Sequence, residues 1–180
     1  MIINQIDDYF LNLFHLAGIN PVLDYFFLII TFFGTFYFGC IFQFIYYFLT
    51  KHIEKTKMIF LAFLANTVIV YLLKNIIKRP RPEIINPSYI PAFKDYSFPS
   101  GHATLSFYMA VILIYEYPKY WYIFFTTALL ITFSRLYFGY HYLSDVIAGI
   151  LMGTLITLFI IKIMKLKKKN KKNENTKSRK

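Results

Sequence analysis

The sequence has a single cysteine, Cys40, and only nine acidic residues against twenty basic ones. One cysteine excludes a disulfide within the chain and any metal site built from several thiolates. The acidic residues are scattered, so the sequence predicts no carboxylate cluster that could hold two Mg²⁺ ions. The N-terminus carries Asp7 and Asp8 and lacks a basic leader region, so we expect no cleavable signal peptide there.

Polar stretches long enough to form a separate domain are also missing. Hydrophobic residues make up 57% of the 180 residues, against roughly 45–50% in ordinary globular domains. They gather in blocks at about 21–49, 58–77, 101–115, 120–137 and 143–163. A helix that crosses a bilayer needs roughly 20 mostly apolar residues. Nothing between the blocks is long enough to fold alone, so we predict one membrane domain over residues 1–165, followed by a disordered basic cytoplasmic tail over residues 166–180.

The expected fold is all-α. The first block contains Gly34 and Gly39, which leaves open whether it forms one span or two. Block 101–115 is short for a full crossing, which suits a helix that begins inside the bundle. Residues 2–17 place apolar side chains at spacings of three and four, which predicts an amphipathic helix in the membrane interface. We therefore expect a helical membrane bundle with five or six membrane-associated helices and an N-terminal interfacial helix.

The net charge of +11 is concentrated at the C-terminus. From Lys162 onward the chain carries ten Lys or Arg and one acidic residue, Glu174, which accounts for +9. This favours a cytoplasmic tail that follows the positive-inside rule and contacts anionic lipid. A nucleic-acid partner is not expected, because the basic run abuts a hydrophobic segment and lacks interleaved aromatic residues.

The loops predict an orientation. Lys51, Lys55 and Lys57 lie between the first two blocks, and with the tail they indicate the cytoplasmic side. Residues 78–100 and 136–142 then share the outer side. Basic residues of the outer loop run against the rule and indicate a local anionic ligand; they are Lys78, Arg79, Arg81 and Lys94. Of these, Lys78 and Arg79 are interpreted as contacts to water or lipid headgroups.

Arg135, His141 and Asp145 fall at or near membrane depth, where a charge costs on the order of 2.5–3.5 kcal/mol. Such residues usually face a cavity and have a function. His141 and Asp145 are four residues apart, so on the last helix they would share a face. The Asp145 carboxylate could then accept a hydrogen bond from one ring nitrogen of His141 and leave the other free to attack.

Other residues complete a predicted phosphate site. The run Pro99-Ser100-Gly101-His102 opens a helix, whose first N–H groups bind anions. Lys74 lies at the end of block 58–77, and Arg81 and Arg135 have forked donors suited to phosphate oxygens. Each feature alone is weak, since a lysine at a helix end is usually an interfacial anchor and a single histidine is usually packed. His15 and His52 are not expected to take part.

The ordered combination is informative. Lys74…Arg81-Pro82, Pro99-Ser100-Gly101-His102 and Ser134-Arg135…His141…Asp145 form the pattern K-x6-R-P, P-S-G-H, S-R-x5-H-x3-D. This resembles the three-part signature of the type-2 phosphatidic acid phosphatase superfamily, with no departure in identity or spacing over residues 74–145. Members include bacterial phosphatidylglycerophosphate, undecaprenyl diphosphate and lipid A phosphatases. The family also holds vanadium haloperoxidases, which are far larger and soluble.

The resemblance implies a metal-independent reaction without a cofactor. His141 would attack phosphorus to form a phosphohistidine, His102 would protonate the leaving oxygen, and Asp145 would orient His141. The phosphate oxygens would be held by Lys74, Arg81, Ser100, Gly101 and Arg135.

We therefore expect a lipid phosphatase of a bacterial inner membrane, with its site on the outer or periplasmic side. The candidate substrates are lipid A 1-phosphate, phosphatidylglycerophosphate and undecaprenyl diphosphate, and we expect loop 83–98 and the first block to choose the headgroup. A phosphotransferase that moves phosphate from a polyprenyl diphosphate to another lipid remains an alternative. So does a non-enzymatic lipid-phosphate binder or transporter.

Overall fold

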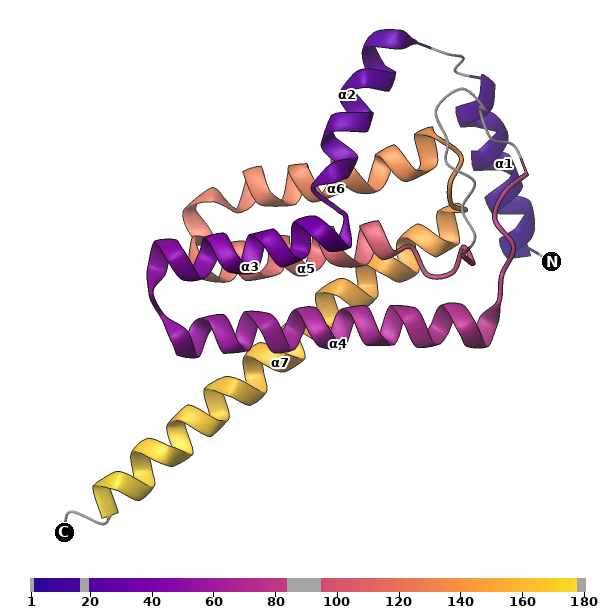
Figure 1. Cartoon of the computed structure of the whole chain (residues 1–180). Coiled ribbons are helices and arrows are strands. Elements are labelled where there is room, and N and C mark those ends of the chain that lie inside the picture. Colours follow the sequence, from indigo (N-terminus) through magenta and orange to yellow (C-terminus); the bar gives the residue numbers. More distant parts are fainter. Residues whose placement is uncertain (1, 17–19, 84–94, 178–180) are drawn as a thin grey trace.

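The computed structural model describes residues 2–16, 20–83 and 95–177. Its elements are α1 (Ile2–Leu16), α2 (Pro21–Phe32), α3 (Phe36–Thr50), α4 (Ile53–Ile77), α5 (Gly101–Glu116), a short 3₁₀ helix η2 (Pro118–Tyr120), α6 (Trp121–Tyr137) and α7 (Leu143–Lys177). No strand occurs in these described ranges (Figure 1), and the prediction of an all-α fold is confirmed.

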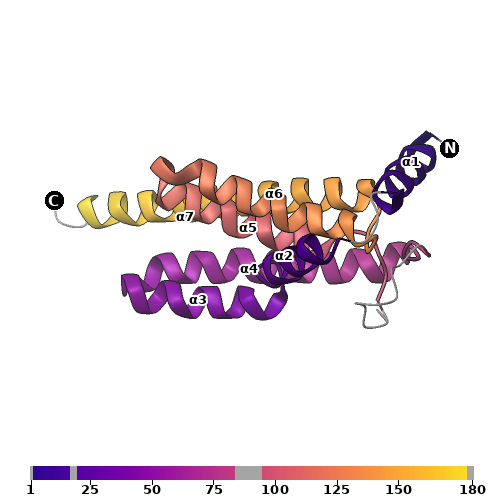
Figure 2. The ribbon, with the colours of Figure 1, turned by 90° about the horizontal axis from the view of Figure 1, so that it is seen from above.

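Helix α5 lies at the centre of the bundle and packs against α4, α6 and α7. Its buried face holds Tyr108 and Ile112, which contact Ile59 and Ala62 of α4. The Tyr108 hydroxyl donates to the Ile59 carbonyl at 3.1 Å, so its polar end is satisfied within the core. Figure 1 shows α3, α4, α5 and α6 running roughly along one direction, with α7 oblique to them and α2 at a steep angle, and Figure 2 shows α3 and α4 side by side.

Small residues bring α5 and α7 close together. A Cβ atom added at Gly149 or Gly153 would overlap the backbone carbonyl of Ser100 or Thr104. Two glycines four residues apart form a small-xxx-small pattern, which allows membrane helices to approach closely. Deeper in the bundle, Asn66 of α4 donates to the Thr157 hydroxyl of α7 at 3.1 Å.

By length and composition, α4 and α7 can each cross a membrane. Helices α2 and α3 pass the same test as a pair bent by 56°, which makes up to three spans. The first apolar block is therefore broken, at residues 33–35. Gly34 occupies this break because its backbone lies against Ile131 and His102, where a side chain would clash. Helices α5 and α6, with 16 and 17 residues, are shorter than the roughly 20 residues of a full crossing.

Apolar side chains cover the outside of the bundle. On α7 they recur at spacings of three and four, at Ile147, Leu151, Leu155 and Leu158, with exposed fractions of 48–62%. An exposed apolar stripe of this length is what a helix presents to lipid, since water would disfavour it. Helix α1 likewise exposes Ile3, Ile6, Tyr9 and Leu13, as an interfacial helix would.

The basic C-terminal segment differs from its prediction. Residues 166–177 continue α7 as helix, where the sequence indicates a disordered tail. The sequence contains no proline or glycine after Gly153, so nothing there interrupts a helix. Lys, Leu and Met, which are common in this part of the chain, favour helix. It extends beyond the other helices (yellow in Figure 1). Residues 178–180 lie outside the described ranges.

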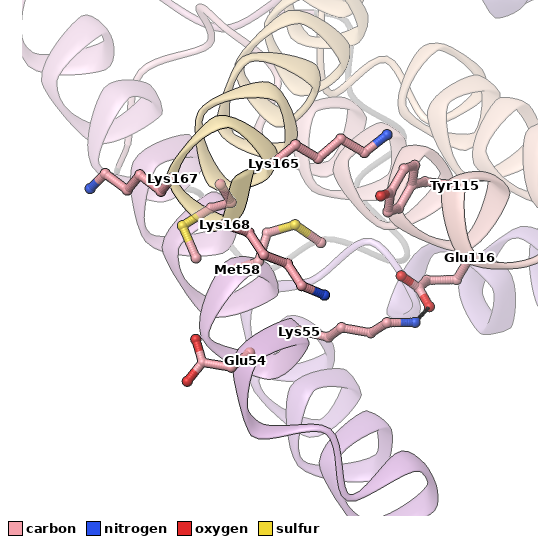
Figure 3. Close-up of a pocket in the computed structure, with 9 residues that line it drawn as sticks. Glu54, Lys55, Met58, Tyr115, Glu116, Lys165, Lys167 and Lys168 are labelled. Carbon is pink, nitrogen blue, oxygen red and sulfur yellow. Dashed lines mark hydrogen bonds and ion pairs between the residues drawn. The ribbon is translucent and has the colours of Figure 1, made fainter. Parts of the chain in front are cut away.

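The bundle has two chemically different ends. At one end, lysines of α4 and α7 surround a cavity of about 420 Å³ (Figure 3); its lining includes Lys55, Lys165, Lys167 and Lys168. The other end is formed by the C-terminal ends of α4 and α6 and the first turns of α5 and α7 (Figure 1). The sequence motifs lie at this second end.

Candidate active site

All eight residues singled out in the sequence lie at the same end of the bundle. Lys74 is in the last turn of α4 and Arg135 in the last turn of α6. Ser100 is the N-cap of α5, and Gly101 and His102 begin that helix. Asp145 is in the first turn of α7. Arg81 and His141 lie in the connections after α4 and α6.

The turn after α6 explains the spacing between Arg135 and His141. Gly139 has φ 66°, a left-handed conformation that glycine adopts without strain. The Gly139 N–H bonds the Leu136 carbonyl and the Tyr140 N–H bonds the Arg135 carbonyl, both at 3.0 Å. This is a Schellman ending, which stops the helix and reverses the chain. The reversal places His141 before α7 rather than on it, which corrects the expectation of a shared helix face with Asp145.

Arg81 lies directly beside the His141 ring. Its Nη1 is 3.3 Å from His141 Nε2 and donates to the Tyr140 carbonyl at 2.8 Å. A guanidinium has no acceptor atom, so Nε2 must accept this contact with its lone pair. The ring proton of neutral His141 then belongs on Nδ1. The nitrogen that faces the cation is therefore the one with a free electron pair.

Asp145 lies on the other side of the ring. Its Oδ2 is 3.5 Å from His141 Nδ1 and accepts the Tyr142 N–H at 3.0 Å. Nδ1 has no hydrogen-bond partner within the described chain, so the Asp145 contact is electrostatic in this structure. Asp145 is fully buried. Its backbone carbonyl also accepts the Ser100 N–H at 3.0 Å, which joins the first turns of α5 and α7.

The pKa of the His141 ring is lowered well below its ordinary value, first by burial and then by the charges of Arg135, Arg81 and Lys74. His141 is 2% exposed. Both causes disfavour the protonated form, so the imidazole is neutral at neutral pH. A neutral imidazole can act as a nucleophile.

Asp95 joins two of the predicted cations. Its carboxylate lies 3.0 Å from Lys74 Nζ and 2.6 Å from Arg81 Nη2. Burial opposes its ionisation, but the hydrogen bonds from Arg81 and Lys74 hold the pKa of Asp95 below its ordinary value. No sequence signal singles out Asp95, because one carboxylate in a proline-rich loop is not distinctive before the fold is known. Most of loop 83–98, at residues 84–94, lies outside the described ranges.

Arg135 is 2% exposed and held on two sides. Its guanidinium lies 4.3 Å from the centroid of the Tyr140 ring, and its Nη1 donates to the Thr31 hydroxyl at 2.9 Å. Thr31 belongs to α2, so the first apolar block contributes to the site. The Arg135 Nε is buried without a hydrogen-bond partner in the described chain.

His102 and Ser100 line the same region from α5. The His102 ring packs against Gly34 at the α2–α3 break and interacts electrostatically with Arg135, His141, Arg81 and Lys74. Ser100 is fully buried, and its hydroxyl makes no hydrogen bond to the described chain. It does not cap its own helix, so the hydroxyl and the first N–H groups of α5 remain available to an anion.

Arg79 was wrongly interpreted as a contact to water or lipid headgroups. It donates to Asp145 Oδ1 and to Asp7 Oδ2, both at 2.7 Å. Burial opposes its charge, but the Asp7 hydrogen bond and the two nearby carboxylates raise the pKa of Arg79. Its partner Asp7 comes from α1, some seventy positions away, and a distant charged pair leaves no local sequence signal. The two aspartates of the N-terminal helix were the one available hint.

Among the described residues, no group of three or more His, Cys, Asp or Glu side chains lies together as metal ligands would. What the site does bring together is a set of cations and a neutral imidazole. The charges of Lys74, Arg81 and Arg135 act on both His141 and His102, and Arg81 lies 3.3 Å from the His141 ring. Such an arrangement can bind a phosphate group and offers a ring nitrogen to its phosphorus.

Curated relatives are similar to part of this chain. An undecaprenyl-diphosphatase of Sulfolobus acidocaldarius is 36% identical over 116 residues, which cover 60% of this chain and 56% of the relative. A lipid A 1-phosphatase of Rhizobium etli is 36% identical over 107 residues, which cover 54% of this chain and 43% of the relative. The chain thus spans about half the length of these curated relatives.

Two solved structures share the fold. A transmembrane PAP2 type phosphatidylglycerolphosphate phosphatase from Bacillus subtilis superimposes with a TM-score of 0.76 at 24% identity, over 90% of this chain and 86% of that one. Aquifex aeolicus LpxE superimposes with a TM-score of 0.71 at 33% identity, over 84% and 94%. The family model of the PAP2 superfamily matches residues 55–169, which include every residue of the three motifs. The chain therefore belongs to the PAP2 superfamily.

Proposed function

We propose that this protein is a membrane enzyme that removes phosphate from a lipid phosphomonoester or diphosphate. One observation carries the proposal: a neutral His141 presents its Nε2 lone pair beside Arg81, at a site that Lys74 and Arg135 also surround. The relatives named undecaprenyl-diphosphatase and lipid A 1-phosphatase belong to the same reaction class.

In the proposed first step, Nε2 of His141 attacks phosphorus while the bond from phosphorus to the leaving oxygen breaks. The negative charge of the bound phosphate offsets the surrounding cations and favours a proton on His102, and His102 gives this proton to the leaving oxygen. The lipid alcohol, or the lipid monophosphate of a diphosphate substrate, therefore leaves in a protonated form. The product is a phosphohistidine. Asp145 lies on the Nδ1 side of the ring and stabilises the positive charge that the ring gains.

In the second step, His102 accepts a proton from water, and the oxygen of that water attacks the phosphohistidine. The bond from phosphorus to Nε2 breaks, which returns His141 to its neutral form and releases inorganic phosphate. Throughout, the charge on the phosphate oxygens is held by Lys74, Arg81, Arg135, the Ser100 hydroxyl and the Gly101 N–H. Positioning and electrostatic stabilisation are the main requirements of phosphoryl transfer.

We propose that the substrate is one of three lipids: lipid A 1-phosphate, phosphatidylglycerophosphate or undecaprenyl diphosphate. Thr31 of α2 contacts Arg135. This contact supports a role for the first apolar block in choosing the headgroup. The other expected determinant, loop 83–98, falls mostly outside the described ranges.

The test is phosphate release by the full chain, purified in detergent, from each of these lipids in the presence of EDTA. We expect release from at least one lipid, and a loss of about a thousandfold or more for His141→Ala, since the nucleophile itself is removed. His52→Ala is the matched control, because His52 is exposed at the start of α4, at the other end of the bundle. A His141→Ala variant with wild-type release, or a strict need for added Mg²⁺, contradicts the mechanism.

The same phosphohistidine could pass its phosphate to a lipid alcohol or lipid phosphate in place of water. A phosphorylated acceptor lipid, formed from a polyprenyl diphosphate without matching free phosphate, would identify this phosphotransferase. A non-enzymatic binder or transporter predicts that His141→Ala retains full function in cells. A nucleophile, an acid and three cations at one proposed site favour an enzyme over a binder, and the relatives named as phosphatases favour the hydrolase over the transferase.

We also propose a multi-pass location in a bacterial inner membrane, with the site facing the outer or periplasmic side. Lys51, Lys55 and the lysines of α7 lie at the end of the bundle opposite the site, and the positive-inside rule assigns that end to the cytoplasm. Accessibility of an engineered cysteine near each end to a membrane-impermeant reagent tests this orientation in intact cells. Labelling of the site end from the cytoplasm alone would contradict it.

The lysine-lined cavity supports the expected contact with anionic lipid. The cavity is lined by Lys165, Lys167 and Lys168, by the apolar side chains of Met58 and Met164, and by Glu54 and Glu116. Glu116 is paired with Lys55 (Figure 3), so the three lysines of α7 are the cations that suit a phosphate headgroup. We expect the double variant Lys165→Gln with Lys168→Gln to retain less phosphatidylglycerol after purification. Lys119→Gln changes an exposed lysine of η2 and is the control. Equal retention by both variants contradicts this contact.

A further inference from the structure

Helix α1 is bound to the start of α7 through one buried carboxylate. Asp7 is 1% exposed, although its neighbours Ile6 and Asp8 are exposed. Its Oδ1 accepts the Ser144 N–H at 2.9 Å, and its Oδ2 accepts the Ser144 hydroxyl at 2.6 Å. Ser144 is in the first turn of α7, so Asp7 caps this helix from another part of the chain.

Arg79 extends this contact to Asp145. Nη2 bonds Asp7 Oδ2 and Nη1 bonds Asp145 Oδ1, each at 2.7 Å, and Nη1 also donates to the Ser144 hydroxyl at 2.7 Å. The guanidinium lies 4.0 Å from the centroid of the Tyr142 ring, which holds its plane in place. One cation therefore joins two buried carboxylates through its fork of donors.

The contact reaches the proposed nucleophile through Asp145. The Oδ1 of Asp145 is held by Arg79, while Oδ2 accepts the Tyr142 N–H and lies 3.5 Å from His141 Nδ1. The orientation of this carboxylate thus depends in part on Arg79, beside the Tyr142 N–H and Ser97, and the position of Arg79 depends in part on Asp7. Removing one partner of a buried ion pair leaves an uncompensated charge, so the remaining groups must rearrange.

We propose that Asp7 and Arg79 are positioning residues for the His141–Asp145 pair, which makes the N-terminal helix part of the active site. This inference rests on the proposed function, because it assigns a role within the same reaction. Helix α1 must then be docked on α7 for full turnover. An interfacial helix that only anchors the chain to the membrane would have no such effect.

A purely structural role makes a different prediction. If Asp7 only stabilises the fold, its loss lowers the amount of folded protein and leaves turnover per folded molecule unchanged. If it positions Asp145, turnover per folded molecule falls while substrate binding changes little, because the phosphate-binding cations are other residues. The ratio of kcat to KM effects therefore separates the two roles.

The experiment compares Asp7→Asn, Asp7→Glu and Arg79→Gln with the wild-type chain on a lipid that the wild type hydrolyses. Folded protein is quantified by size-exclusion chromatography in detergent. We expect Asp7→Asn to lower kcat about ten- to a hundredfold, since a misplacement on the order of 1 Å can cost about a hundredfold. KM should stay within about twofold. Asp7→Glu should restore part of the loss, because it keeps the charge.

Two controls complete the design. Asp8→Asn makes the same chemical change at the next position of α1, where the side chain is exposed, and should leave kcat unchanged. The double variant Asp7→Asn with Arg79→Gln should be no slower than Arg79→Gln alone, because Asp7 acts through Arg79.

A wild-type kcat for Asp7→Asn, or effects that multiply in the double variant, overturns the positioning role while the phosphatase assignment stands. A wild-type chain that releases no phosphate from any lipid overturns the proposed function itself.

Discussion

The carboxylate of Asp95 lies 3.0 Å from the ammonium of Lys74, so a cation expected to bind phosphate already holds an internal anion. Arg81 is engaged by the same carboxylate at 2.6 Å. A substrate phosphate that binds these cations must therefore compete with Asp95.

Asp95→Asn should lower KM about two- to fivefold, the size expected for a partly exposed ion pair. The neutral amide keeps the shape of the side chain and removes the competing charge. Steady-state kinetics on a lipid phosphate checks this. Glu83→Gln removes an exposed charge after α4 and is the matched control. A higher KM for Asp95→Asn would show that the carboxylate supports the site rather than competes for it.

The pH dependence should follow the His141 ring. Burial and the nearby cations lower the pKa of His141 below the ordinary value of 6.5. The ring therefore gains its proton only at more acidic pH, and the neutral nucleophile persists when an ordinary histidine would already be charged. We expect the acid limb of kcat/KM that belongs to the enzyme to lie below pH 6.5.

The measurement needs one correction. A phosphomonoester loses its second proton at about pH 6. Because this lies close to the expected acid limb of the enzyme, the ionisation of the lipid must be titrated separately. An enzyme-derived acid limb at or above the ordinary histidine value would contradict the lowered pKa.

Arg135 should not tolerate replacement by lysine. Its guanidinium stacks on Tyr140 and donates to Thr31, and an ammonium can reproduce neither the stacking nor the fork. We expect Arg135→Lys to lower kcat/KM about ten- to a hundredfold, because misplaced positive charge stabilises the transition state poorly. Thr31→Val keeps the shape of its side chain, removes one acceptor, and should have a smaller effect. Equal activity of Arg135→Lys and the wild type would exclude a bidentate contact.

Helix packing gives a prediction that does not involve activity. Gly153→Ala would place a methyl group against the Thr104 backbone, and overpacking of this kind costs about 1–3 kcal/mol. Thermal unfolding in detergent should show the loss. Leu155→Ala, two residues along on the exposed side of α7, removes more atoms but should change stability less. Unchanged stability of Gly153→Ala would mean that α5 and α7 can move apart freely.

The sequence alone was sufficient for the all-α fold class and for the motif residues, but not for the helical segment 166–177. Most of the helices follow from long apolar runs, which a membrane can bury whatever their neighbours are. Gly34 and Gly39 left open whether the first run is one span or two, and the structure breaks it at Gly34. The motif residues could be recognised because their spacing along the chain is itself the signal. Their convergence was expected from the alternation of chain direction, which brings the end of α4 and the start of α5 to one side.

Tertiary structure decided which charges meet. Asp7, Arg79 and Asp95 carry no local pattern, and their partners lie far away in sequence, so burial and distance alone reveal their ion pairs. The chain reversal at Gly139 separated His141 from the helix of Asp145, which helical spacing could not foresee. Sequence periodicity reports how each helix divides its faces between lipid and protein, whereas a buried ion pair depends on how the helices are arranged around one another.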